Sequence, residues 1–172
     1  MDTQKLTKYL FNGFDRIYAV IDGASVPELQ DKLFEIQPEH FCLYRGELEP
    51  DIAEIAPYII RIVANTPLCD WILEEGWGKH WGIFVQSKYS LAEMRKHLRK
   101  FLTVYDEAGK PMLFRFYDPR VLRTFLPTCN NEELKDLFGL ALYFALEDEN
   151  PKNIVNYFLP NGELKISVID IS

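Results

Sequence analysis

The charged residues of the segment 113–122, Leu-Phe-Arg-Phe-Tyr-Asp-Pro-Arg-Val-Leu, are the first candidates for chemistry in this chain. Arg115 stands among aromatic residues, and an arginine in apolar surroundings needs a carboxylate or a phosphate, because an unpaired buried charge is very costly. Asp22 and Asp118 are the carboxylates that we expect to neutralise Arg115 or Arg120. Arginine forks could instead hold a phosphorylated or carboxylated small molecule, as in an enzyme.

These two alternatives place different demands on the sequence. An internal Arg–Asp lock only has to hold a helix against a sheet, whereas an enzyme needs further acid–base groups beside the arginines. If the strands lie side by side, their carboxyl ends would gather these groups at the edge where ligands of α/β proteins usually bind. No second carboxylate or histidine is placed there for catalysis, so we favour the lock.

The usual catalytic and cofactor motifs are missing. The sequence has no Gly-x-Ser-x-Gly elbow, no phosphate-binding loop and no dinucleotide fingerprint. His40, His80 and His97 are far apart, and none has a cysteine or histidine at metal-ligand spacing. We therefore expect no catalytic residues, no metal and no cofactor.

A basic helix face and a tryptophan are candidates for binding a partner. The capping box of Ser90 and Glu93 begins a helix with an apolar stripe on one side and cations on the other. Those cations are either solvated surface charges or a docking surface for an acidic partner. Trp77 stands between two glycines, where we expect an exposed side chain, and Trp and Arg are enriched at binding hot spots. The possible partner-binding residues are Trp77, Arg95, Arg99 and Lys100.

Composition narrows the class of protein. The chain has 172 residues, of which 48% are hydrophobic, and this is enough for one folded core. Its net charge of −7 argues against nonspecific nucleic-acid binding, which depends on Lys and Arg. There is no apolar run of the roughly 20 residues that a membrane span needs and no apolar leader, and the three scattered cysteines indicate a reducing compartment. We expect a cytoplasmic protein without membrane insertion or nucleic-acid partner.

Hydrophobic periodicity predicts the elements that position these residues. Strands are predicted over residues 17–21, 41–44, 57–63, 80–86 and 114–117. Helices are predicted over residues 27–36, 67–75, 90–102, 118–126 and 130–138, and a short helix or arm over residues 3–14. Asp118 and Pro119 are suited to the N-cap and first turn of their helix. Two apolar runs, 155–159 and 164–169, flank Asn161-Gly162, a strong hairpin signal.

This order of elements predicts an α/β fold, with a mixed sheet flanked by helices and a C-terminal β-hairpin appendage. Residues 1–140 would form the α/β domain. Residues 141–172 would supply C-terminal strands and the hairpin, either within the same compact unit or as a small lobe.

Five short motifs occur in a specific order between residues 16 and 140. They are Tyr18-Ala-Val-Ile-Asp22-Gly-Ala24, Leu43-Tyr-Arg-Gly46, Ala56-Pro-Tyr58, His97-Leu-Arg99 and Phe114-Arg-Phe-Tyr-Asp-Pro-Arg-Val-Leu122. The ordered set resembles the adaptor-chaperone family of bacterial type VI secretion systems, the Tap- or Tec-type proteins long catalogued as a domain of unknown function. The last motif carries most of this resemblance, and the tail after Gly139 is not covered.

The resemblance implies a cytoplasmic, non-enzymatic protein that binds a toxic effector and helps to load it onto the VgrG spike. The uncovered tail would then take part in choosing the cargo. The family signature, structural or partner-binding, corresponds here to Asp22, Arg45, Arg115, Tyr117, Asp118, Pro119 and Arg120.

Two other functions stay open from the sequence alone. One is an enzyme that uses the Asp22, Arg115, Asp118 and Arg120 cluster on a small anion. The other is an immunity protein that blocks a toxin, because small acidic proteins meet basic enzymes quickly through their opposite fields.

Overall fold

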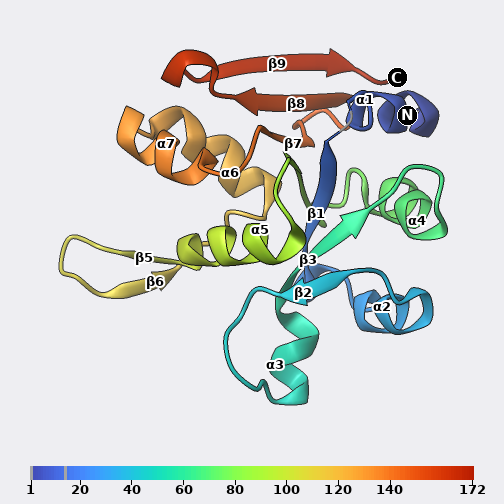
Figure 1. Ribbon diagram of the computed structural model, residues 1–172, viewed down its shortest axis with the longest axis horizontal. Helices are drawn as coiled ribbons and strands as arrows, with labels where there is room; N and C mark the ends of the chain where they lie inside the picture. The colour runs from blue at the N-terminus through green and yellow to red at the C-terminus, as the bar shows by residue number, and fades with distance from the viewer. Residues whose placement is uncertain (1, 14) are drawn as a thin grey trace.

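Seven strands form one antiparallel sheet in the computed structural model, which describes residues 2–13 and 15–172 (Figure 1). Their order across the sheet is β2-β3-β1-β4-β7-β8-β9. The strands are β1 (Arg16–Asp22), β2 (His40–Cys42), β3 (Pro57–Ile62), β4 (Gly82–Ser87), β7 (Tyr143–Glu147), β8 (Asn153–Phe158) and β9 (Lys165–Asp170). The predicted class, an α/β sheet flanked by helices with a C-terminal hairpin, is confirmed, and each pairing between the described strands is antiparallel.

Helices cover both faces of the sheet. The helices are α1 (Thr3–Leu10), α2 (Leu29–Ile36), α3 (Pro50–Ile55), α4 (Pro67–Gly76), α5 (Leu91–Leu98), α6 (Pro119–Phe125) and α7 (Asn131–Phe138). One hydrophobic core lies between the sheet and α5, α6 and α7, and a second lies between the sheet and α1, α2 and α4 (Figure 1). Every helix within the described ranges falls short of the length and apolarity that a bilayer span requires.

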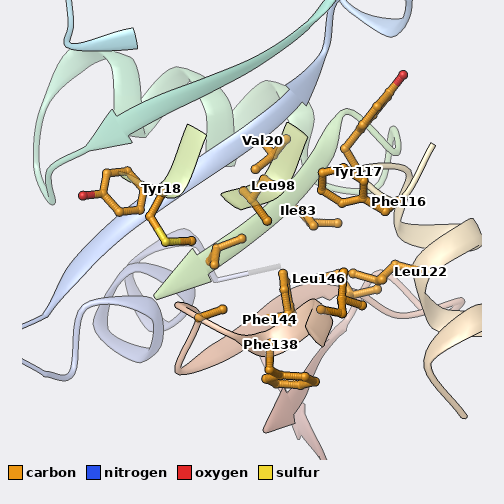
Figure 2. Packing of buried hydrophobic residues seen from close by; sticks show 14 of the residues in the cluster. Tyr18, Val20, Ile83, Leu98, Phe116, Tyr117, Leu122, Phe138, Phe144 and Leu146 are labelled. Atoms are coloured by element: carbon orange, nitrogen blue, oxygen red, sulfur yellow. The ribbon is translucent and has the colours of Figure 1, made fainter. Parts of the chain in front are cut away.

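Strand β1 is central to both cores. It pairs with β3 on one side and with β4 on the other, and because helices cover both faces of the sheet, all its residues after Arg16 are buried. Tyr18 and Val20 join the core beneath α5, α6 and α7, where they pack near Ile83 (Figure 2), whereas Ala19 faces the opposite core. A strand buried on both faces has a continuous apolar sequence, as residues 17–21 do.

Local capping signals define several helix ends as predicted. Ser90 and Glu93 form the expected capping box at the start of α5, and Asn130 forms a second one with Glu133 at the start of α7. Asp118 caps α6 with its side chain, and Pro119 occupies the first turn. These interactions satisfy backbone amides that have no partner inside the helix.

The C-terminal hairpin continues the main sheet. β7 pairs with β4, β8 pairs with β7, and β9 pairs with β8. The turn between β8 and β9 contains Asn161 (φ 55°) and Gly162 (φ 81°), as expected from the Asn-Gly signal. The N-terminus is attached to this tail, because the Asp2 amide donates to the Ile171 carbonyl at 2.8 Å. The tail is therefore an extension of the sheet edge.

The strand predicted over residues 114–117 is wrong. The nearby strand pair is instead β5 (Thr103–Tyr105) with β6 (Pro111–Leu113), a two-stranded ribbon that projects from the body (Figure 1). The following residues turn into α6, and Phe116 and Tyr117 are buried in the core. Their aromatic character reflects burial beside a helix and not a pleated strand surface.

Other boundaries shift by a few residues. The helix predicted over residues 3–14 ends at Leu10, and Phe14 lies outside the described residues. β4 begins at Gly82 and not at residue 80, because His80 has a left-handed backbone (φ 61°) that a strand cannot contain. The helix α3 was not predicted from the sequence.

Stability should depend on pH through His97, which is 6% exposed between α5 and α7. Its Nε2 lies 2.9 Å from the Leu137 carbonyl. Burial lowers the pKa of His97 below the ordinary 6.5, with a smaller contribution from Lys100, whereas the Leu137 carbonyl and Asp136 oppose the change. The unfolded chain then binds a proton more readily, so the free energy of unfolding should fall as pH drops below 6.5, by at most about 1.4 kcal/mol per pH unit from this group.

Urea unfolding between neutral and mildly acidic pH would measure this dependence. The variant His97→Gln can still donate to a carbonyl but does not titrate, so its stability should change less over the same pH range. Equal slopes for the two proteins would show that His97 is not the source.

Candidate functional site

The Arg–Asp cluster lies where β1 ends and α6 begins. The Asp22 amide donates to the Trp81 carbonyl at 2.8 Å, and Asp22 pairs with Pro57 across the sheet. The predicted gathering of strand carboxyl ends is wrong, because antiparallel pairing places the end of β1 beside the starts of β3 and β4. The loop before α6 brings Arg115 and Asp118 to this end of the sheet.

Asp22 is held by three donors. Its Oδ2 accepts from Arg115 Nη2 at 2.5 Å and from Ser25 Oγ at 2.8 Å, and its Oδ1 accepts from the Ala24 amide at 3.2 Å. The Asp22 side chain is 2% exposed and that of Arg115 is 41% exposed. The buried carboxylate is thus fully paired, while part of the guanidinium reaches solvent.

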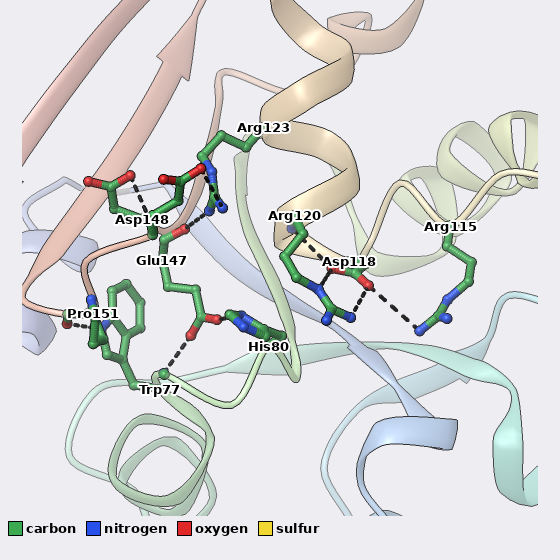
Figure 3. A network of polar contacts seen from close by, with 11 residues as sticks. Trp77, His80, Arg115, Asp118, Arg120, Arg123, Glu147, Asp148 and Pro151 are labelled. Carbon is green, nitrogen blue, oxygen red and sulfur yellow. Dashed lines mark hydrogen bonds and ion pairs between the residues drawn. The ribbon is translucent and has the colours of Figure 1, made fainter.

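Asp118 is gripped by the second arginine of the motif. Its two oxygens accept from Nε and Nη2 of Arg120 at 3.0 and 2.7 Å, and Oδ1 also accepts from the Arg120 amide (Figure 3). Arg115 approaches the same carboxylate at 3.8 Å. Burial by itself would raise the pKa of Asp118, but the bonds and charge of Arg120 and the charge of Arg115 hold that pKa below its ordinary value.

Asp22 and Asp118 therefore neutralise Arg115 and Arg120, as the sequence predicted. We call these four residues the Arg–Asp lock, because they fasten the start of α6 to the end of β1. Two further signature residues are internal: Pro119 and Tyr117 are buried. Burial raises the pKa of the Tyr117 hydroxyl far above its ordinary value.

A neighbouring group of polar contacts was missed from the sequence. Glu147, at the end of β7, is 3% exposed and accepts hydrogen bonds from the Gly78 amide and from His80 Nδ1 (Figure 3). Arg123 donates to the Glu147 backbone carbonyl at 3.0 Å. Glu147 directly follows an apolar run, and this was the signal that its side chain is buried. The group ties the loop before β4 to β7 and α6.

Trp77 is half-buried and not exposed as expected. Its indole nitrogen donates to the Pro151 carbonyl at 2.7 Å, and its ring stacks near Phe84. A cavity of about 10 Å³, the space of one water molecule, lies beside it. The geometry gives Trp77 a structural role, and its predicted role in partner binding stays a prediction.

The predicted basic residues Arg95 and Arg99 lie beside β2, the edge strand of the sheet. Arg95 Nε donates to the Cys42 carbonyl at 3.0 Å, and Arg99 donates to the carbonyls of Leu43 and Tyr44 at 3.2 and 3.0 Å. Arg45 belongs to this group and not to the Arg–Asp lock. Burial lowers the pKa of Arg99, and the nearby charges of Arg95 and Arg45 lower it further.

Lys100 is exposed on the turn that follows α5, next to Arg99 in sequence. Across residues 2–13 and 15–172, no three His, Cys, Asp or Glu side chains gather as a potential metal site. Two clusters of arginines therefore stand out. In the Arg–Asp lock the arginines pair with buried aspartates, and beside β2 they bond to backbone carbonyls.

Comparison with known proteins identifies the family. The family model described as "Domain of unknown function (DUF4123)" matches residues 17–136. The chain belongs to the DUF4123 family. The resemblance to the type VI secretion adaptor family, which the ordered motifs indicated, is thereby confirmed. The matched region includes both the Arg–Asp lock and the β2 edge, and it ends before β7.

A curated relative is "Accessory protein VasW" of Vibrio cholerae serotype O1 (strain ATCC 39315 / El Tor Inaba N16961). It is 25% identical over 116 residues, which are 66% of this chain and 38% of the relative. This chain therefore spans well under half of that relative's length. No solved structure is significantly similar to the chain.

Removing Arg115 should destabilise the fold. Arg115→Gln leaves the buried Asp22 carboxylate without its ionic partner, and we expect a loss of about 1–3 kcal/mol in the free energy of unfolding. Because the guanidinium is 41% exposed, solvent screening favours the lower part of this range.

A double-mutant cycle with Asp22→Asn would isolate the pair. Loss of both charges should cost less than the sum of the two single losses, with a coupling energy of about 1 kcal/mol. Strict additivity in denaturant unfolding would mean that the two side chains do not stabilise each other.

Proposed function

We propose that this chain is a non-enzymatic adaptor that works in the cytoplasm, where it binds a type VI secretion effector and assists its loading onto a VgrG spike. The observation that carries the proposal is the family match over residues 17–136. The similarity to an accessory protein supports it, although that relative is much longer than this chain.

The geometry of the charged residues agrees with a binding role. The Asp22 and Asp118 carboxylates, which an enzyme would need for acid–base chemistry, are buried and held by arginines and backbone amides. General acid–base catalysis requires a group that can reach substrate and change its protonation state near neutral pH. Arginine binding instead favours the ionised form of Asp118 at such pH.

The proposal predicts that the tagged chain co-purifies with an effector, a VgrG protein or both from a strain that secretes by this system. Deletion of the gene should abolish delivery of that effector while leaving other effectors secreted, because an adaptor serves its own cargo. Mass spectrometry of the purified complex and a secretion assay would measure both effects.

A strain without the spike gene is the matched control, since effector binding should persist there while VgrG is absent from the complex. Retrieval of neither partner, with delivery intact after deletion, would refute the adaptor role. If the chain protects cells from the retrieved toxin without affecting its secretion, it acts as an immunity protein instead.

A further inference from the structure

Three arginines at the β2 edge have no acidic partner. No ion pair within 4.0 Å involves Arg45, Arg95 or Arg99 among the described residues. The chain as a whole carries a net charge of −7. Three neighbouring arginines without an ion-pair partner are therefore unusual in such an acidic protein. We call these three residues the β2-edge arginines.

Two of them are positioned by the open edge of the sheet. β2 pairs with β3 on one side only, and the Cys42 and Tyr44 carbonyls accept hydrogen bonds from Arg95 and Arg99. The Arg95 guanidinium also lies 4.7 Å from the centre of the Phe41 ring, a cation–π contact. Both arginines are therefore held in place before any partner arrives, which reduces the entropy lost on binding.

The guanidinium groups keep donors for a partner. An arginine has five N–H groups, and the β2 edge uses only part of those on Arg95 and Arg99. Arg95 and Arg99 are half-buried, and none of their guanidinium nitrogens is among the fully buried atoms that lack a partner in the described part of the chain. The nitrogens that form no hydrogen bond within the protein therefore keep some access to solvent. Arg45 is exposed beside them.

We propose that the β2-edge arginines form a docking surface for an acidic segment of a partner protein, whose carboxylates bind the guanidinium donors that the sheet edge leaves free. Arginine and carboxylate make charge-assisted hydrogen bonds in a bidentate geometry. A carboxylate between the arginines would also relieve the mutual repulsion of three cations that lie close together.

Charge and backbone geometry favour an acidic segment over a nucleic acid and over an added β-strand. A nucleic acid extends its charge along its length, and beyond Arg45 it would meet the exposed Glu47 and Glu49 and an acidic protein overall. An added β-strand is disfavoured, because Arg95 and Arg99 already donate to the Cys42 carbonyl of β2, one of the groups that such a strand would need. A short acidic segment requires neither a long cationic surface nor a free edge.

The proposal rests on the proposed adaptor function for the identity of the natural partner, but its test does not. The full chain would be titrated into a fluorescently labelled peptide rich in Asp and Glu, with anisotropy as the readout. A peptide with Asn and Gln at the acidic positions and a single-stranded DNA of equal charge are the two comparison probes.

We expect the acidic peptide to bind and the neutral peptide not to bind. Arg45→Glu should weaken binding at least about tenfold, since a charge-assisted hydrogen bond is replaced by repulsion. Arg95→Gln should weaken binding in the same direction. Thermal unfolding of each variant would show that the fold is intact. Arg45→Glu is the variant less prone to unfold, because the Arg45 side chain is exposed and forms no ion pair with residues 2–13 or 15–172.

Lys110→Glu is the matched control, because it makes the same charge change on the exposed turn between β5 and β6. It should leave the affinity within about twofold of the unchanged chain, as expected for a distant screened charge. If Lys110→Glu and Arg45→Glu weaken peptide binding equally, the effect comes from the net charge of the protein and not from the β2-edge arginines, and the proposal is overturned.

Absence of peptide binding, or tighter binding of the DNA than of the peptide, would also overturn it. If the peptide fails to bind while the tagged chain still retrieves an effector or VgrG, the docking surface is wrong and the adaptor function stands. If the peptide binds but no secretion partner is retrieved, the surface stands and the adaptor function is wrong.

Discussion

The ion pair between Asp22 and Arg115 is the constraint on which this structure depends most. It joins the end of the central strand β1 to the loop before α6, two segments that are far apart in sequence. The Asp22 carboxylate is almost completely buried, so it would be unstable there without a cation. Asp118 and Arg120 form a second pair within the first turn of α6, while Leu122 and Leu126 pack that helix against the sheet.

The two groups of arginines in this protein differ in their partners, and that difference suggests their roles. Those of the Arg–Asp lock face buried carboxylates and stabilise the fold. The β2-edge arginines bond to backbone carbonyls, which orient a guanidinium without neutralising it. A fold that orients positive charges but leaves them without a counter-ion is suited to contact with an acidic partner, and this agrees with an adaptor that acts by binding.

The family match and the physical architecture do not end at the same place. The match ends at residue 136, whereas the sheet continues through β7, β8 and β9. These last strands share both hydrophobic cores, through residues such as Phe144 and Ile154, and the N-terminal helix contacts them by way of Tyr9 and Asn156. The tail is thus structurally part of the sheet even though its sequence lies outside the range that the family model matches.

The sequence by itself determined the features that depend on neighbours along the chain. The capping box at Ser90, the apolar run of β1 and the Asn-Gly turn of the hairpin each follow from patterns over a few residues. It also predicted that Arg115 needs a carboxylate, since that requirement holds for any arginine in apolar surroundings. Tertiary structure decided which carboxylate it meets, that residues 114–117 pack as a turn and not as a strand, and that Glu147 is buried beside His80. These outcomes depend on the antiparallel order of the strands, because that order sets which distant strand ends lie side by side, and no local pattern specifies it.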